Sequence, residues 1–414
     1  MKEQKKRRKG SVTVLVAVCL VGMLSFVALS IDGGLLMDHR QQVQSAADAA
    51  ALAAAEDLFL NWNTNQGLDP SGTAKAAAQA SAAANGFPSP TVNIPPLSGP
   101  FTGQPGYAEV ILTYNQQRSF STIFGSTDNV TVRARAVAEA GYKAAKVGIL
   151  VLNPSAPGSV TDTGGGTVTI AGSAPLIVDS SAPNAITVTG GGSVTATEID
   201  VTGVPGISGN ANAPTINSGQ PQTPDPLAYL PAPDPSTMPS YNGVHLTTGT
   251  LTINPGVYKG GISVTGGGQI PTLIMNPGIY YMQGGGFNIG GQANLTATGV
   301  MIYNAPQKSS DVISITGGGS VTLSPPTTGP YAGISLFQDR TSTNTVSVSG
   351  GAGSAYYGTF YVAGGTLSVT GGGTNSIIGS QYISNNLTVN GNGAFTINWS
   401  PNQVGKTRIL RLVE

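Results

Sequence analysis

The tetrapeptide Thr-Gly-Gly-Gly recurs along the chain after residue 142 and strongly constrains how that region can fold. Its copies begin at Thr163, Thr189, Thr265, Thr316 and Thr370. Their spacings of 26, 76, 51 and 54 residues are near multiples of roughly 25. Short runs of β-branched residues flank the copies, as in ITVTGGGSVTATEIDV and ISITGGGSVTL. Repeats of this length, made of short strands and glycine turns, indicate a solenoid.

Stacking explains how such short strands would become stable. One rung of the solenoid exposes both of its edges and buries its Val, Ile and Leu side chains only against neighbouring rungs. We expect glycine at tight corners that need a positive φ, and Thr and Ser on the solvated strand face. The repeats predict a right-handed parallel β-helix-like solenoid over residues 143–405. An antiparallel β-sandwich is the alternative, because short alternating strands alone do not separate the two.

Two segments of this region depart from the repeat pattern. Residues 204–243 hold nine prolines and show no strand pattern, which predicts a proline-rich insertion in extended conformation. Residues 406–414 bring three basic residues back into a region that has few. We expect them to form a C-terminal tail that caps the open end of the solenoid.

The region after residue 143 offers few side chains for chemistry. It has nine acidic residues, one histidine and no cysteine, so metal clusters and nucleophile–base pairs are hard to assemble. The best acidic pair is Glu198 and Asp200, which lie about 7 Å apart on one face of a strand and would suit glycosidic acid–base chemistry. Two neighbouring surface acids without a role are the commoner case. We expect a non-enzyme with no catalytic, cofactor-binding or metal-binding residues.

Other polar and aromatic residues of this region are assigned structural roles. Asp311 and Asp339 are isolated in the sequence, and His245 is expected in a loop. Tyrosines recur, and rings in a row can stack on sugars. Internal stacking between rungs is the preferred interpretation for Tyr258, Tyr280, Tyr281, Tyr303, Tyr356, Tyr357 and Tyr361.

The chain has one strongly apolar run, Ser11 to Ile31, which is uncharged over 21 residues. A helix of that length spans a hydrocarbon core of about 30 Å. Six of the 19 basic residues lie in the first nine positions, which predicts a cytoplasmic basic segment at residues 1–10 and the bulk of the chain outside. The net charge of zero gives no field that would attract nucleic acid.

Residues 32–142 are expected to form a small α+β module. Alanine dominates from Ala46 to Ala55, where helix propensity is highest, so the anchor should continue as a helix beyond a flexible point at Gly33 and Gly34. A second alanine-rich helix is predicted at Thr73–Gly86. The runs TVNI, YAEVILTYN and VTVRARAVAEAGY follow with the period of strands.

Three stretches together resemble the N-terminal segment of TadG-like proteins of Tad/Flp pilus assembly: RRKGSVTVLVAV, the Asp32 that ends the apolar run, and QQVQSAADAAALAAA. The resemblance covers roughly residues 7 to 58. The order of long helix, short helix and small sheet is similar to that of pilin-like proteins of the same system.

The resemblance implies a membrane-anchored envelope protein with a structural, anchoring or adhesive role. Its partners would be the cytoplasmic membrane and components of a pilus or secretion apparatus, with self-association or an envelope glycan as further possibilities. The location would be the bacterial cytoplasmic membrane, crossed once, with a cytoplasmic N-terminus and the bulk periplasmic or extracellular. The alternative is a membrane-tethered polysaccharide-binding or polysaccharide-cleaving β-helix protein. Processing near Gly10 stays open, because Leu15 stands where pilin-type leaders place Glu.

Overall fold

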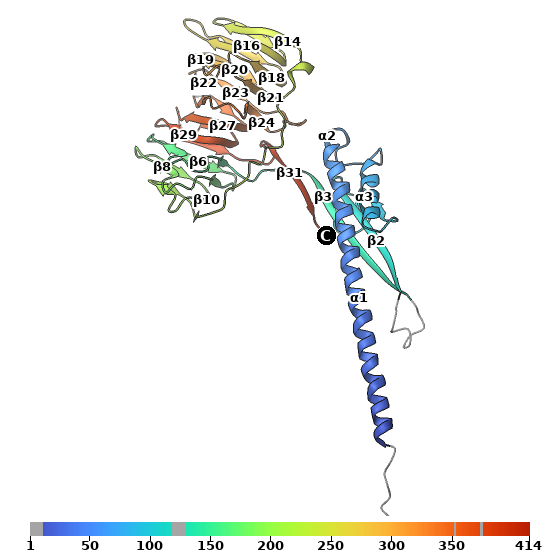
Figure 1. The fold of residues 1–414 in the computed structure, drawn as a ribbon. Coiled ribbons are helices and arrows are strands. Elements are labelled where there is room, and N and C mark those ends of the chain that lie inside the picture. Colours follow the sequence, from blue (N-terminus) through green and yellow to red (C-terminus); the bar gives the residue numbers. More distant parts are fainter. Residues whose placement is uncertain (1–10, 118–128, 352, 373–375) are drawn as a thin grey trace, which may run out of the picture. The chain divides into compact units, whose positions relative to one another are not determined.

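The computed structural model describes residues 11–117, 129–351, 353–372 and 376–414 (Figure 1). The basic segment predicted for residues 1–10 lies outside them. The chain forms two units: unit 1 comprises residues 1–141 and 409–414, and unit 2 comprises residues 142–408. Unit 2 is therefore an insertion into unit 1. The chain leaves unit 1 along β3 (Asn129–Ala144) and returns along β31 (Lys406–Leu412).

Unit 1 consists of helices and a four-stranded sheet of order β1-β2-β3-β31, in which β2 pairs antiparallel with both β1 and β3. Four elements before β3 lie at the segments that the sequence predicts: α1 (Ser11–Leu60), α3 (Thr73–Ala84), β1 (Thr91–Asn93) and β2 (Tyr107–Gln117). The sequence does not predict the short helix α2 (Trp62–Asn65).

Two expectations about unit 1 need correction. Helix α1 runs without interruption over 50 residues and contains Gly33 and Gly34, so the predicted flexible point is regular helix. The C-terminal segment is strand β31, hydrogen-bonded to β3. It completes the sheet of unit 1 and does not cap the solenoid.

Unit 2 is a parallel β-helix solenoid, because its strand pairings are parallel, as in β16 with β18 and β27 with β29. This excludes the antiparallel sandwich. The larger sheet has 17 strands: β4 (Ile149–Val151), β5 (Val160–Asp162), β7 (Leu176–Val178), β8 (Ile186–Val188), β10 (Glu198–Val201), β11 (Ile207–Ser208), β13 (Thr215–Ser218), β14 (Ser240–Leu246), β16 (Gly256–Thr265), β18 (Gly278–Gln283), β19 (Phe287–Gly290), β21 (Val300–Ala305), β22 (Ile313–Ile315), β24 (Ile334–Gln338), β25 (Val346–Ser349), β27 (Thr359–Thr370) and β29 (Gln381–Asn390).

The second sheet of the solenoid has ten strands: β6 (Thr167–Ala171), β9 (Ser193–Thr195), β12 (Ala211–Asn212), β15 (Thr250–Ile253), β17 (Thr272–Met275), β20 (Asn294–Ala297), β23 (Val321–Leu323), β26 (Ala355–Tyr356), β28 (Ser376–Ile378) and β30 (Phe395–Asn398). Side chains that point between the two sheets form one continuous apolar core.

The rungs do not stack in the order of the sequence. The late strand β29 pairs with the early strands β4 and β5, and β30 pairs with β6. The stack therefore runs from β14 and β15 at one end, through β29 and β30, into β4 to β6, and ends at β11, β12 and β13. Figure 1 shows this order by colour, because the red strands lie between the yellow and the green ones. The solenoid is circularly permuted: its chain entry and exit lie at an internal junction.

Residues 219–239, which we call the strap, carry the chain from one end of the stack back to the other. The backbone N–H of Thr223 donates to Asp179 (2.8 Å), and the hydroxyl of Tyr331 donates to the carbonyl of Pro231 (3.1 Å). At the far end, the N–H of Val257 donates to the carbonyl of Pro239 (2.8 Å). The strap thus contacts rungs along the length of the solenoid.

The middle of the strap is fixed by a network of side chains. Arg340 lies over the rings of Phe337 and Tyr361, about 5 Å from each centroid. Its guanidinium donates to the Tyr361 hydroxyl (2.6 Å) and to the carbonyl of Leu227 (2.7 Å). The Tyr361 hydroxyl in turn donates to Asp225 of the strap. Leu227 itself is fully buried in a second apolar cluster on the outside of the larger sheet.

The strap is shorter than the insertion that the sequence predicts. Residues 204–218 contain β11, β12 and β13, and β14 begins at Ser240. Strands β11, β12 and β13 have only two to four residues, and β14 contains a single β-branched residue, so their pattern is weak in the sequence. Strands β11, β12 and β13 belong to one end of the solenoid and β14 belongs to the other. Only the strap, residues 219–239, crosses from one end to the other.

The Thr-Gly-Gly-Gly copies lie at one corner, where a strand of the larger sheet ends and a strand of the smaller sheet follows. A β-carbon on Gly164 would overlap the carbonyl oxygen of Gly391 in the adjacent rung, and one on Gly319 would overlap that of Ala293. Neither glycine has a positive φ. Close approach of neighbouring backbones therefore explains Gly164 and Gly319, whereas Gly190 and Gly191 in the Thr189 copy have the positive φ that we expected at the corner.

Candidate functional site

The N-terminal part of α1 exposes apolar side chains all round, including Val12, Leu24 and Phe26. By length and composition this helix could cross a membrane. The hydroxyls of Ser25 and Ser30 in this stretch are satisfied within the helix, because they donate to the carbonyls of Val21 and Phe26 at 2.8 Å. Internal pairing of polar groups is what hydrocarbon surroundings require.

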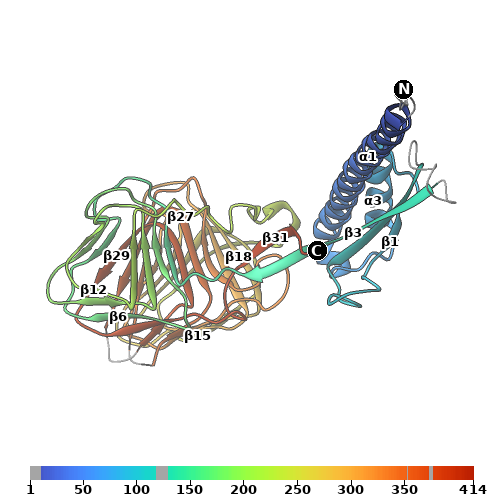
Figure 2. The same ribbon diagram turned by 90° about the horizontal axis from the view of Figure 1, so that it is seen from below.

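The C-terminal part of α1 has the opposite environment and packs within unit 1. Helix α3 presents a stripe of buried alanines with a spacing of four residues, and α1 lies beside it (Figure 2). Alanine side chains allow a short distance between helix axes. The buried residues of α1 are Val43, Ala46, Ala47, Ala50, Ala51, Ala54, Ala55, Leu58 and Phe59. The alanine-rich sequence thus serves packing inside this module.

A buried carboxylate, Glu109 of β2, anchors the sheet of unit 1. It accepts hydrogen bonds from Ser98, from Asn93 (2.7 Å) and from the N–H of Leu97 (3.2 Å), and it pairs with Arg135 (2.7 Å). Burial alone would raise the pKa of Glu109, but these donors outweigh it and lower the pKa to about 2. The carboxylate is therefore ionised and fully partnered.

Two further ion pairs attach the C-terminal strand to this sheet. Arg411 contacts Glu139 at 2.8 Å, and Glu139 also accepts from the hydroxyl of Tyr107 (2.9 Å). Glu414 pairs with Arg135. The end of the chain is thereby held beside β3 and, through Arg135, connected to the Glu109 network.

The acidic pair singled out in the sequence lies on the outer face of β10, next to the end of the solenoid. Ile199 and Val201 are fully buried, so the carboxylates of Glu198 and Asp200 point outward as expected. The side-chain amide of Asn217 in β13 donates to both, at 3.1 Å to Glu198 and 2.8 Å to Asp200. One amide bridging two carboxylates is an arrangement that stabilises a rung junction.

Asp311 and Asp339, which are isolated in the sequence, each accept hydrogen bonds from nearby groups. Asp311 accepts the N–H groups of Gln307 and Lys308, both at 2.9 Å, and orders the loop after β21. Asp339 accepts from Tyr303 (2.7 Å) and Thr341; burial raises its pKa, but these hydrogen bonds outweigh that effect and lower it. Asp339 and Lys308 line a polar pocket of about 370 Å³.

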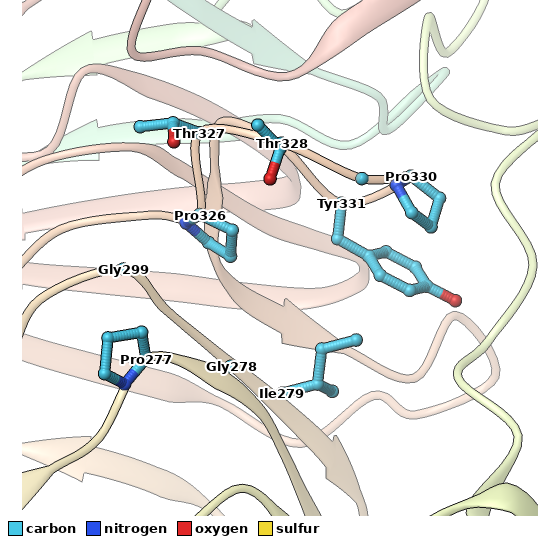
Figure 3. Close-up of a pocket in the computed structure, with 10 residues that line it drawn as sticks. Pro277, Gly278, Ile279, Gly299, Pro326, Thr327, Thr328, Pro330 and Tyr331 are labelled. Atoms are coloured by element: carbon cyan, nitrogen blue, oxygen red, sulfur yellow. The ribbon is translucent and has the colours of Figure 1, made fainter. Parts of the chain in front are cut away.

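A second pocket of about 360 Å³ lies between two turns of the solenoid. Figure 3 shows Pro277 and Ile279 on one side and Pro326, Thr328 and Tyr331 on the other. Its walls are proline, glycine, threonine and two larger apolar side chains. Its lining residues include no carboxylate, amine or imidazole, and the phenol of Tyr331 is their one titratable group.

Four of the seven named tyrosines contact other tyrosines of the solenoid, which confirms the preferred interpretation for them, whereas Tyr356 and Tyr361 meet Phe360 and Phe337 edge-on. Tyr258 lies between Tyr241 and Tyr280, with ring centroids 5.2 and 5.8 Å apart, and Tyr281 contacts Tyr303 at 5.0 Å. Five of the seven named tyrosines are buried and Tyr281 and Tyr357 are half-buried. His245 lies in strand β14, not in a loop, and is exposed.

Metal-binding side chains do not gather in the described residues: no group of three or more His, Cys, Asp or Glu is found there. The single cysteine, Cys19, lies exposed in the apolar part of α1.

Sequence reasoning missed several residues that organise the two units. Glu109 and Arg135 lie in strands whose apolar pattern masks them, although an acid in the buried phase of a strand is a usable signal. Asn217, Asp225 and Arg340 act across long sequence separations, and no local pattern marks them.

Comparison with known families supports the resemblance seen in the sequence. Residues 10–57 match the family described as "Putative Flp pilus-assembly TadE/G-like". No curated protein and no solved structure matches the chain. The match covers most of α1, both its exposed apolar part and its buried alanine-rich part. The N-terminal segment of this chain is therefore similar to the TadE/G-like family over residues 10–57 and is followed by a β-solenoid.

Proposed function

We propose that this protein is a non-enzymatic, membrane-anchored envelope component related to Tad/Flp pilus assembly. Helix α1 would hold it in the bacterial cytoplasmic membrane, crossing once with the N-terminus in the cytoplasm. Both units would then lie in the periplasm or outside the cell, and the solenoid would act as a structural, anchoring or adhesive element.

One observation carries this proposal. The family match at residues 10–57 coincides with a single helix that is apolar and exposed at its start and packed into unit 1 at its end. Such a helix joins the membrane to a folded module without a flexible linker. An inserted solenoid is then presented on a support that is itself fixed to the anchor.

The non-enzymatic part of the proposal is supported by the state of the acidic pair. Glu198 and Asp200 each use a carboxylate oxygen to accept from Asn217, so they already have a structural partner. A variant with Glu198→Gln and Asp200→Asn should bind envelope glycan as the wild type does. Loss of a glycan-cleaving activity in that variant would instead establish the polysaccharide-active alternative.

The test of the anchored role is in-cell crosslinking of the tagged full chain, detergent extraction, purification and mass spectrometry of its partners and of its own N-terminus. We expect pilus components, such as secretin or pilin, and an intact start at Met1 or Lys2. Recovery of the protein alone, or with envelope glycan only, would contradict a role in pilus assembly.

A matched pair of variants tests the anchor itself. Leu20→Arg together with Leu24→Arg places charge in the exposed apolar part of α1, and we expect the protein to leave the membrane fraction. Leu68→Arg changes an exposed leucine of unit 1 outside that helix and should leave fractionation unchanged. Equal fractionation of both variants would contradict anchoring by α1.

A further inference from the structure

Both ends of the solenoid expose core positions that are buried in the other rungs. At the end formed by β14 and β15, the inward-facing Val244, Leu246 and Leu251 are only partly buried. At the end formed by β11, β12 and β13, Ile207 and Ala211 are partly buried and Ile216 is 45% exposed. Solenoids need polar capping rungs to stay soluble as single molecules, and open strand edges are templates for further pairing.

The two ends are complementary, because two adjacent columns of side chains keep their chemistry from end to end. One inward column is apolar in ten successive strands: Val244, Ile262, Phe287, Ile313, Val346, Leu367, Leu387, Val160, Ile186 and Ile207. The adjacent outward column consists of His245, Ser263, Asn288, Ser314, Ser347, Ser368, Thr388, Thr161, Thr187 and Ser208. A second copy placed end to end would therefore continue both columns in register.

The molecule already contains such a junction. Strands β29 and β30 stack on β4, β5 and β6, although those rungs are separated by more than 200 residues of sequence. Leu387 meets Val160 there, and Thr388 meets Thr161. Parallel pairing and matched columns therefore join two rungs of this sequence without a direct connection between them.

Charge favours the head-to-tail orientation. Residues 149–218, which form the rungs at the β13 end, contain four acidic residues and no lysine or arginine. Residues 240–300, at the β14 end, contain Lys259 and His245 and no acidic residue. Two like ends would bring charges of one sign together, whereas opposite ends attract.

We propose that the solenoid stacks head to tail with a second copy of this chain, with β14 and β15 of one molecule pairing with the β11–β13 end of the next. The contact is heterologous, so it can repeat and build a row of molecules. The chain enters and leaves the solenoid at the internal junction, away from both ends. The strap, which joins β13 to β14, is therefore the only segment that leaves from the end rungs.

Cysteine crosslinking of the full chain in detergent tests this contact. In a Cys19→Ser background, one preparation carries Ser208→Cys and the other His245→Cys. Parallel neighbours lie about 4.8 Å apart, within the Cα separation that a disulfide spans. We expect a mixed disulfide dimer at least tenfold above the yield from Thr187→Cys mixed with Ser263→Cys. These control positions belong to the same column, but their neighbours on both sides lie in the same molecule.

A second variant separates a specific contact from random collision. Val244→Lys adds a charge at the open edge, where natural sheets use lysine to block pairing, and we expect it to abolish the mixed dimer without altering the far-UV circular dichroism spectrum. Mixed crosslinking no stronger than the control, or no stronger than either single-site preparation with itself, would overturn the proposal.

Discussion

Glu109 of unit 1 and Asp162 of unit 2 are buried carboxylates in opposite environments. Glu109 of unit 1 has several donors and a guanidinium, so its pKa falls to about 2. Asp162 of unit 2 is also buried, but its Oδ2 atom has no hydrogen-bond partner among the described residues, and burial raises its pKa. Its neighbours in the column are Val389 and Val188. A core made by repetition offers apolar neighbours above and below, whereas the irregular sheet of unit 1 can bring donors together.

The largest effect should come from breaking the ion pair of unit 1. Arg135→Met leaves Glu109 buried without its cation, which should lower the free energy of unfolding of unit 1 by about 3 kcal/mol. Hydrogen exchange of the backbone amides of β2 and β3 measures this change in the free energy of unfolding. Arg133→Met, at an exposed position of the same strand, is the control. Equal effects of the two variants would contradict the importance of the pair.

In unit 2, a side-chain network holds the strap, as side-chain networks hold the sheet of unit 1. Substitution of Leu227 tests whether the strap is held in this way. Leu227→Ala removes a fully buried side chain and should cost about 2 to 3 kcal/mol. We expect faster proteolysis within residues 219–239, while Leu68→Ala at an exposed position should have no effect. An unchanged cleavage rate would mean that the strap is not held by this contact.

Alanine should be destabilising at one glycine of the Thr-Gly-Gly-Gly corner and tolerated at another. Gly164→Ala places a β-carbon against the backbone of the adjacent rung and should destabilise unit 2 by about 2 kcal/mol. Gly268→Ala has open space around the new carbon and should be neutral. Thermal unfolding of both variants decides this, and equal losses would refute the close-approach explanation.

The smallest effect concerns pH and has opposite signs in the two units. Because the folded pKa of Asp162 is raised, its contribution to stability is complete below the unfolded value of 3.8 and is lost as pH rises through the folded value. Asp162→Asn should therefore stabilise unit 2 by about 1 kcal/mol at neutral pH, and the gain should vanish near pH 3.

Glu109 provides the contrast. Its stabilisation is present above the unfolded pKa of 4.5 and is lost as pH falls toward about 2. Glu109→Gln should destabilise unit 1 at neutral pH and remove this acid dependence. Hydrogen exchange measures the stability of each unit as a function of pH. If Asp162→Asn and Glu109→Gln had the same pH dependence, the contrast between the two carboxylates would be contradicted.

The sequence predicts much of this architecture where neighbours in space are neighbours in the chain. The helices, the hairpin of β2 and β3 and the parallel stacking follow from local periodicity and from the glycine repeat. The order of the rungs does not follow, because the column that contains Thr161 and Thr388 repeats the same polar chemistry from rung to rung. Thr388 would pair as well with Thr187 as with Thr161, so no side chain specifies that the last rung meets the first.

The candidate sites show the same division. The anchor and its family resemblance lie in one continuous segment, and the sequence identifies both. The bridge from Asn217 to Glu198 and Asp200, and the contact of Arg340 with Leu227, join distant segments. Polar pairs of this kind form only after the rungs are in place, so periodicity carries no information about them.

The permuted stacking of the solenoid is the central structural claim, and an intramolecular disulfide tests it most directly. In a Cys19→Ser background at high dilution, Thr161→Cys with Thr388→Cys should form a disulfide within one chain, because the two residues are partners in adjacent strands. Asn217→Cys with Ser240→Cys, which would be neighbours if the rungs followed the sequence, should not. A disulfide within one chain in the second pair and none in the first would contradict the account.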